Sequence, residues 1–229
     1  EHFNLTTGFR STVFEPLYRV FFYLPLAFMG FTALDILFAY LVTQIYGNLV
    51  HTQAVGKLHP WFEYIFVTPS HHRVHHAINK EYMDKNYGQI FIFWDKWFGT
   101  FQEELESESP VYGVSRPVRT WNPIKINFQH LLLLVKDAIR TDNFWDKLTI
   151  WFRPTGWRPD DVKEKYAVEK IEDVNDYEKF NPPADHQLIL WSWVQFAFIM
   201  LNTLFFFGSI SKIGTPNIFF YGLYAFISI

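Results

Sequence analysis

The stretch QLILWSWVQFAFIMLNTLFFFGSIS, residues 187–211, has 25 consecutive positions without a charged side chain. About 20 apolar residues in a helix are enough to cross the hydrocarbon core of a bilayer. Asp185 precedes the stretch and Lys212 follows it. Trp191 and Trp193, near its start, are typical of the lipid–water interface. These residues therefore predict a membrane-spanning helix.

A second apolar region lies near the start of the chain. Residues 20–34 and 36–56 carry no charge, and Asp35 separates them. Pro25 and Gly30 divide the first stretch, so the region predicts two helices that enter the membrane as a hairpin, with Asp35 near the turn. A pair of core helices in a soluble protein is the alternative.

The two ends of the sequence suggest that it has been cut. It begins with Glu1 rather than Met, and it stops at Ile229 inside an apolar run that follows Pro216. That run predicts a further membrane helix. We therefore expect the 229 residues to be a fragment of a longer protein.

The composition excludes several classes of protein. Aromatic residues make up 21% of the chain and charged residues only 19%, which excludes a disordered or low-complexity chain. The absence of cysteine excludes disulfide scaffolds, thiolate zinc sites, iron–sulfur clusters and cysteine nucleophiles. A net charge of −3 gives no general attraction to nucleic acid. Metal or membrane chemistry remains, and 9 histidines point to a metal.

The middle of the chain, residues 59–184, is polar and is interrupted by 9 prolines. Residues 127–140 (NFQHLLLLVKDAIR) predict an amphipathic helix, and residues 160–179 predict a charged, solvated segment. The sequence as a whole predicts an all-α integral membrane protein with a polar, histidine-rich metal-binding region. The Lys and Arg residues of this region favour the cytosolic side of the membrane.

Four of the 9 histidines lie within six positions, in the stretch TPSHHRVHH at residues 68–76. The Pro-Ser pair before them favours a helix start. In a helix, His72, His75 and His76 fall at positions i, i+3 and i+4 on one face. Imidazoles that converge in this way suit iron, copper, nickel or zinc.

Two further histidines are candidates for the same site. His51, near the end of the second apolar helix, is a candidate fourth ligand because ionisable residues at a membrane edge are typical of functional sites. His71 shares a face with His75 and is a candidate for a supporting hydrogen bond. A pH-sensitive patch is the alternative. Packed imidazoles without a ligand would repel or stay unsatisfied, so the pattern favours a metal.

The cluster and the motifs that follow it resemble a known family. Residues 68–76, then DKNYG at 84–88 and WDKWFGTF at 94–101, are similar to the last histidine box of the fatty acid hydroxylase and sterol desaturase superfamily. The similarity is closest to the alkylglycerol monooxygenase branch. His51 matches the isolated histidine that precedes this box, and residues 1–5 (EHFNL) resemble the segment that follows the second box.

The resemblance implies a division of the chain into three parts. Residues 1–130 would be the C-terminal part of the catalytic domain, with membrane helices at about 17–56. Residues 131–184 would be a polar, partly helical connection, and residues 185–229 would be C-terminal membrane helices. The family's other histidine boxes would precede Glu1, so this chain would carry about half of the metal ligands.

For the site, the resemblance implies a di-iron centre that activates dioxygen. Its ligands in this chain would be four histidines, His51, His72, His75 and His76. Its supporting residues, which hydrogen-bond to ligating imidazoles, would be His71, Asp84, Asn86 and Tyr87. Helix capping is the alternative for Asp84 and Asn86. Arg73 is expected to point away from the metals, toward a lipid headgroup or an acidic partner.

The expected function is that of a membrane-bound di-iron oxygenase acting on a lipid C–H bond. Its partners would be a lipid substrate, dioxygen and an electron donor or reductase. The branch resembled implies a glyceryl ether as substrate and a reduced pterin as donor, with fatty acyl chains and sterols as alternatives. The alternative class is a non-enzymatic membrane protein that binds or transports metal. The cluster lacks the HExxH glutamate of a zinc hydrolase.

Overall fold

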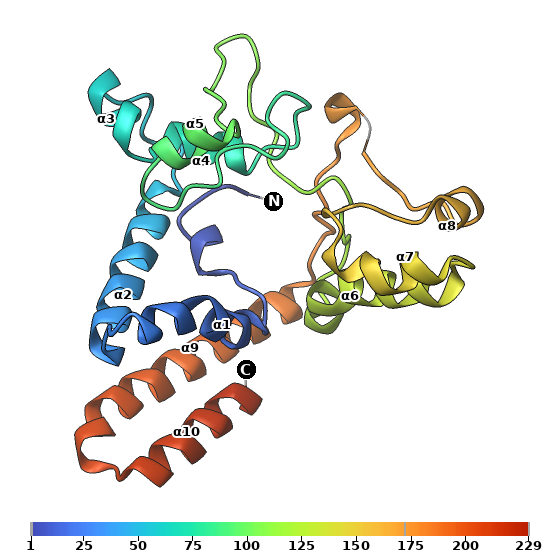
Figure 1. Cartoon of the computed structure of the whole chain (residues 1–229). Coiled ribbons are helices and arrows are strands. Elements are labelled where there is room, and N and C mark those ends of the chain that lie inside the picture. The colour runs from blue at the N-terminus through green and yellow to red at the C-terminus, as the bar shows by residue number, and fades with distance from the viewer. Residues whose placement is uncertain (1, 172, 229) are drawn as a thin grey trace. The chain divides into compact units, whose positions relative to one another are not determined.

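The structure is a computed structural model that describes residues 2–171 and 173–228 (Figure 1). The described residues form helices and loops without any strand; backbone bridges occur singly, at Phe66–Phe91 and Ala77–Tyr112. This confirms the predicted all-α class. The elements are η1 (Thr7–Phe9), α1 (Glu15–Phe28), α2 (Ala33–Val50), α3 (Pro60–Ile65), α4 (Pro69–His75), α5 (Phe93–Phe98), α6 (Pro123–Arg140), α7 (Phe144–Thr149), η2 (Ile150–Phe152), α8 (Asp160–Lys165), η3 (Val174–Asp176), α9 (His186–Ser209), η4 (Ile210–Lys212) and α10 (Thr215–Ser228).

The chain divides into two compact units, Glu1–Lys179 and Phe180–Ile229. The first unit contains the histidine cluster, and the second contains α9 and α10. In the second unit, the Tyr221 hydroxyl donates a hydrogen bond to the Asn202 carbonyl at 2.9 Å. Its ring stacks on Phe206, with 4.8 Å between centroids. These contacts hold α9 and α10 together as a hairpin.

The turn between α1 and α2 follows from two local signals. Gly30 has a φ of +94°, a left-handed conformation that glycine adopts without strain. Thr32 then caps α2, because its side chain accepts a hydrogen bond from the Asp35 amide while Asp35 Oδ2 accepts one from the Thr32 amide at 2.9 Å. The predicted turn near Asp35 is confirmed. Pro25 lies inside α1 and does not end it.

Two helices are long and apolar enough to cross a membrane, Ala33–Val50 and His186–Lys212. At 1.5 Å per residue they extend over about 27 Å and about 40 Å, compared with about 30 Å for a hydrocarbon core. Leu17–Phe28 is apolar but shorter. The spanning window of the second helix has none of its residues buried.

The core of the first unit lies around α4. Val74, Ala77 and Tyr82 form a buried cluster. The Tyr82 hydroxyl donates to the Glu108 carbonyl at 2.6 Å and accepts from the Leu105 amide at 2.9 Å. The loop that follows the histidines is thereby fixed against the chain near residue 105. The buried cluster holds α4 through its residue Val74.

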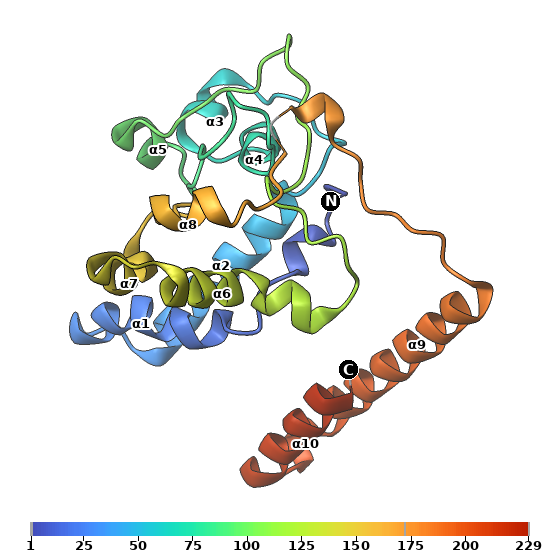
Figure 2. The ribbon, with the colours of Figure 1, turned by 90° about the vertical axis from the view of Figure 1, so that its right-hand side faces the viewer.

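A second layer of the first unit is formed by α6, α7, η2 and α8 (Figure 2). Asn122 caps α6 by accepting hydrogen bonds from two amides of its first turn. The predicted helix at 127–140 is confirmed and begins earlier, at Pro123. Arg158 forms a buried bidentate ion pair with Asp137 of α6, at 2.5 and 2.8 Å. This pair fixes the chain before α8 onto α6.

Candidate metal centre

The start of α4 explains why its histidines are held in place. Pro69 occupies the first helical position, where its missing N–H costs nothing. The Thr68 side chain accepts from the His71 amide, and His71 Nδ1 accepts from the Thr68 amide at 3.3 Å. This capping box fixes the first turn of the helix, which confirms the helix predicted from the Pro-Ser start.

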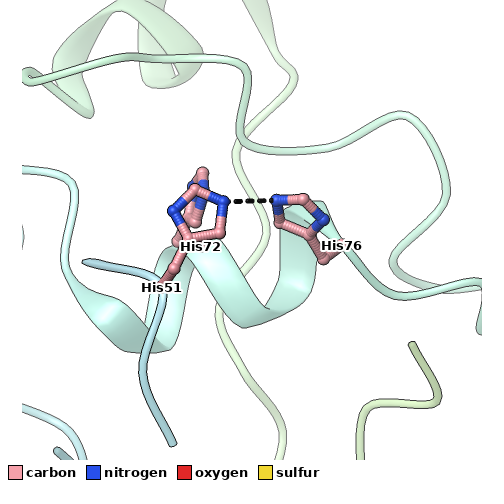
Figure 3. A group of neighbouring side chains, drawn as sticks. All are labelled: His51, His72 and His76. Carbon is pink, nitrogen blue, oxygen red and sulfur yellow. Dashed lines mark hydrogen bonds between the residues drawn. The ribbon is translucent and has the colours of Figure 1, made fainter. Parts of the chain in front are cut away.

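Three imidazoles meet between the end of α2 and α4 (Figure 3). His51 is the residue that ends α2, and His72 and His76 come from successive turns of α4. The Nε2 atom of His51 lies 3.0 Å from Nε2 of His72 and 3.1 Å from Nε2 of His76. Nitrogens bound to one ion at about 2.0–2.1 Å and at right angles are about 3 Å apart. The three side chains could therefore hold a metal ion.

The environment of the rings favours their neutral form. Burial lowers the pKa of His51, and it lowers that of His72 well below its usual range. Burial, with the nearby charges of His75 and His51, lowers the pKa of His76 to about 3. Nδ1 of His51 lies 2.6 Å from the Gly47 carbonyl, which only accepts, so this nitrogen carries the proton and Nε2 offers its lone pair.

The protein alone does not satisfy these rings. Nδ1 of His72 is buried and has no hydrogen-bond partner among the described residues. If Nε2 of His72 carried the proton, it would donate to Nε2 of His51. Nε2 of His76 faces the same His51 nitrogen and would compete with His72 for its lone pair. A cation among the three Nε2 atoms removes this conflict, because each imidazole then contributes a lone pair. The donor set thus fits a metal of the kind that imidazole prefers.

His75 and His71 lie outside this group of three. His75 is exposed; its ring stacks on that of His72, with 5.4 Å between centroids, and its Nδ1 lies 3.2 Å from the Lys85 carbonyl. His71 is buried, and its Nε2 lies 4.0 Å from Glu63 Oε2. Burial lowers the pKa of His71 and the Glu63 charge partly opposes this. His71 thus fixes the helix start.

The supporting residues predicted from the loop after α4 make different contacts. Asn86 is buried and donates to the His71 carbonyl at 3.1 Å and to the Gln102 carbonyl at 2.7 Å. The Tyr87 hydroxyl donates to Asp84 Oδ1 at 3.0 Å, and the Tyr87 ring lies edge-on to His75. No hydrogen bond joins these three side chains to an imidazole of the group, within the described part of the chain. They determine where α4 and its loop lie.

Arg73 points away from the imidazoles, as the sequence predicts, and its acidic partner is Glu104 of the same chain. The guanidinium donates to both carboxylate oxygens, at 2.8 and 2.6 Å. It also donates to the carbonyls of Thr52 and Val55, at 3.3 and 2.7 Å. One buried side chain of α4 therefore ties the segment that follows His51 to the loop at Glu104.

Sequence patterns did not identify the residues that cover the site. Phe3 is only 2% exposed, and its ring stacks on His51 and on Tyr112, at 5.6 and 4.9 Å between centroids. It also contacts the ring of His76 at 5.3 Å. Gly8 packs closely against Asn48 and His51, since an added Cβ would lie 2.2 Å from Asn48 Oδ1 and 3.0 Å from His51 Nδ1. The sequence signal that could have pointed to Phe3 was the family resemblance of residues 1–5.

Burial of Tyr112 raises the pKa of its phenol to about 12. Its ring packs on Phe3, which in turn contacts the imidazoles of His51, His72 and His76.

Comparison with known proteins identifies the class to which this arrangement belongs. The sequence model of the fatty acid hydroxylase family matches residues 1–100. The match covers 100 of the 229 residues and confirms the resemblance seen in the histidine motifs. No solved structure matches the chain.

The curated relatives are more specific. The chain is 35% identical to alkylglycerol monooxygenase of Homo sapiens over 203 residues, which are 87% of this chain and 44% of the relative. It is 36% identical to the enzyme of that name from Xenopus tropicalis, over 69% of this chain and 35% of the relative. With that from Danio rerio the identity is 34%, over 88% and 43%. The chain spans less than half of the length of these relatives.

Proposed function

We propose that this chain is part of a membrane-bound lipid monooxygenase that acts on glyceryl ethers. The observation that carries the proposal is the convergence of three imidazole nitrogens on one point between α2 and α4. The family match and the names of the relatives support the reaction class and the substrate. Fatty acyl chains and sterols are the less favoured substrates.

The proposed metal is iron, held in this chain by His51, His72 and His76. A bound di-iron centre would supply the activation of dioxygen that a monooxygenase needs. His75 is the fourth proposed ligand. A carbonyl only accepts, so Nδ1 of His75 carries the proton toward Lys85 and its Nε2 is free to bind a metal. His71, Asp84, Asn86 and Tyr87 support the ligands by fixing α4.

The other proposed roles of the chain are to admit a lipid and to exclude water. Phe3 and Tyr112 form an apolar cover beside the histidines. The surface of α2 that leads to His51 is apolar and exposed, for example at Ile45 and Leu49. A lipid that slides along α2 would remain in an apolar environment until it reaches the metal site. We also propose that the site faces the cytosol and that a reduced pterin supplies electrons.

Metal analysis and turnover of the full-length protein test this proposal. Single variants His51→Ala, His72→Ala and His76→Ala are expected to lose most of the bound iron and at least a hundredfold of the turnover of a glyceryl ether. His130→Ala, on the exposed surface of α6, is the matched control and is expected to keep both. The proposal is wrong if the three variants keep their iron and turnover.

The same assay separates the alternatives. If the full-length protein binds iron but oxidises neither a glyceryl ether nor a fatty acid with reduced pterin, the non-enzymatic metal-binding class is favoured. Oxidation of the fatty acid alone would reject the glyceryl ether as substrate. Replacing the reduced pterin with an unrelated reductant in this assay tests whether the pterin is the electron donor.

A further inference from the structure

The segment from α6 to η2 presents an apolar surface that is largely exposed in the described part of the chain. In α6, the side chains of Ile124, Phe128, Leu131, Val135 and Ile139 recur at intervals of three or four positions and so form one stripe along the helix. Ile139 is 73% exposed. Four large residues beyond the stripe, in α7 and η2, are also exposed: Phe144, Trp145, Leu148 and Phe152. Phe152 is the most exposed, at 90%.

Basic side chains border this surface. By their helical positions, Lys125 and Lys136 lie along one edge of the stripe. Arg140 lies further round the helix, with its guanidinium 3.9 Å from the centre of the Tyr166 ring. Over residues 121–158, basic residues outnumber acidic ones six to three, whereas the whole chain has a net charge of −3. Neither border lysine forms an ion pair in the described part of the chain. The one acid within α6, Asp137, is neutralised by Arg158.

The opposite side of the segment is firmly packed, so the exposed face is not a consequence of a loose fold. Asp137 and Ile150 are buried, and the Asp137–Arg158 pair joins α6 to the chain before α8. The Thr141 hydroxyl donates to the Asp161 carboxylate at 3.0 Å. The segment is therefore held in one orientation, with its apolar stripe outward.

A third contact places this segment next to a helix that is itself apolar. The Val13 amide donates to Asn127 Oδ1 at 3.0 Å, and the rings of Phe14 and Phe128 meet edge to face at 5.4 Å. These residues join the start of α6 to the start of α1, whose own side chains Phe21 and Phe22 are exposed. The apolar stripe of α6 and the exposed side chains of α1 thus belong to the same unit of the chain.

From these observations we infer that α6, α7 and η2 lie flat in the lipid–water interface of an anionic membrane leaflet. An apolar stripe with aromatic residues and a cationic border is the pattern of a helix that lies in the interface plane rather than across the bilayer. The apolar side chains enter the acyl region, and Lys125 and Lys136 contact anionic headgroups. A lipid surface explains both the exposed rings and the sign of the bordering charge.

Spin-label accessibility in the full-length protein tests the inference. The present residues contain no cysteine, so one nitroxide-labelled cysteine can replace Ile139 in a background without other cysteines. The protein is reconstituted in nanodiscs of phosphatidylcholine and phosphatidylserine. Glu106→Cys, on an exposed loop of the same unit, is the matched control. Circular dichroism confirms that both variants fold.

The label at Ile139 is expected to collide more with oxygen than with a water-soluble nickel chelate, and the label at Glu106 should show the reverse. Two outcomes would overturn the inference. High access of the nickel chelate to Ile139 would place the stripe in water. Low access of both reagents would show that another part of the protein covers it.

A charge variant tests the anionic lipid. The double variant Lys125→Gln and Lys136→Gln should shift the Ile139 label toward water in nanodiscs that contain phosphatidylserine. In pure phosphatidylcholine it should leave the label where it is. An equal effect in both lipids, or none in either, would reject the role of anionic headgroups.

Discussion

The two ring nitrogens of His51 lie in different surroundings, and this difference determines what the residue can do. Nδ1 faces a backbone carbonyl of α2, and Nε2 faces two other imidazoles. The carbonyl fixes the tautomer, as the backbone partners of metal-bound histidines commonly do. His51 therefore presents a lone pair toward His72 and His76 before any metal binds.

Phe3 is expected to control how much water reaches these rings. Phe3→Ala should destabilise the full-length protein by about 3–5 kcal/mol, since it empties a buried site. It should also weaken iron binding at mildly acidic pH, because burial is the main cause of the lowered histidine pKa values. Denaturation in detergent and iron content at pH 6 measure both effects. Phe9→Ala, an exposed residue of the same segment, should change neither; equal effects of the two variants would contradict the prediction.

The histidines also predict how stability depends on pH in the metal-free protein. The unfolded chain protonates a histidine near its ordinary pKa of 6.5, whereas folded His76 stays neutral down to about 3. Between these values the unfolded state binds more protons, so the free energy of unfolding falls as the pH falls. The slope is at most about 1.4 kcal/mol per pH unit and per group. Above pH 6.5 the full stability is present.

Melting temperatures of the metal-free protein between pH 8 and pH 4 check this dependence. The double variant His72→Gln and His76→Gln should show a flatter curve, because two of the groups responsible have been removed. Bound iron should raise the curve at neutral pH and lose its effect on acidification, since protons compete for the same nitrogens. A variant curve parallel to that of the wild type would refute the assignment.

At the scale of elements, α4 shows what local sequence can predict. Its start follows from Pro69, and the i, i+4 spacing of His72 and His76 places both rings on one face. The position of His51 can also be predicted from local sequence, because His51 is the residue that ends the apolar helix α2. The partners of Phe3 and Arg73 did not follow, since Tyr112 and Glu104 lie 109 and 31 positions away. The periodicities of helices and strands relate residues a few positions apart, so they do not predict contacts between residues this far apart in the sequence.

Asn86 illustrates a different limit. The family motif predicts that Asn86 hydrogen-bonds to a ligating imidazole, whereas its amide donates to two backbone carbonyls in the structure. Its φ of +54° is a conformation that asparagine tolerates better than most residues. Residue type alone does not distinguish an amide that binds a ring from one that fixes a turn.

The Arg73 side chain connects three elements, and its loss should therefore affect more than one of them. Arg73→Ala leaves the half-buried Glu104 carboxylate without its partner and should cost up to about 3–5 kcal/mol of stability. It also frees the segment after His51, so iron content should fall. Arg73→Lys keeps the charge but loses the paired hydrogen bonds and should lie in between.

A surface ion pair provides the control for this prediction. Arg119→Ala breaks an exposed pair with Glu169 and should cost about 0–1 kcal/mol. Denaturant unfolding and metal analysis in detergent compare the variants. If Arg73→Ala is as stable as Arg119→Ala, the three elements are held together by other contacts.

At the scale of the whole molecule, the two units are expected to depend little on each other for metal binding. Phe3, Gly47 and His75, which contact the three histidines, belong to the same unit as they do, Glu1–Lys179. A protease site inserted between Lys179 and Asp185, in the exposed stretch with two adjacent prolines, can be cut after reconstitution. The iron content per chain should not change. The same insertion between Asp84 and Asn86 should release iron after cleavage, and iron loss at the first position would show that the units cooperate.

The length of α2 sets the depth at which chemistry would occur. If α2 crosses the bilayer, its capped start lies at one boundary, and its 18 residues, about 27 Å, bring His51 to the opposite one. That is the level at which acyl tails join the glycerol backbone. The carbon next to the oxygen of a glyceryl ether lies at this level too. Such a lipid would present its reactive bond without leaving its leaflet, whereas a carbon midway along a fatty acyl tail would have to bend back toward the headgroups.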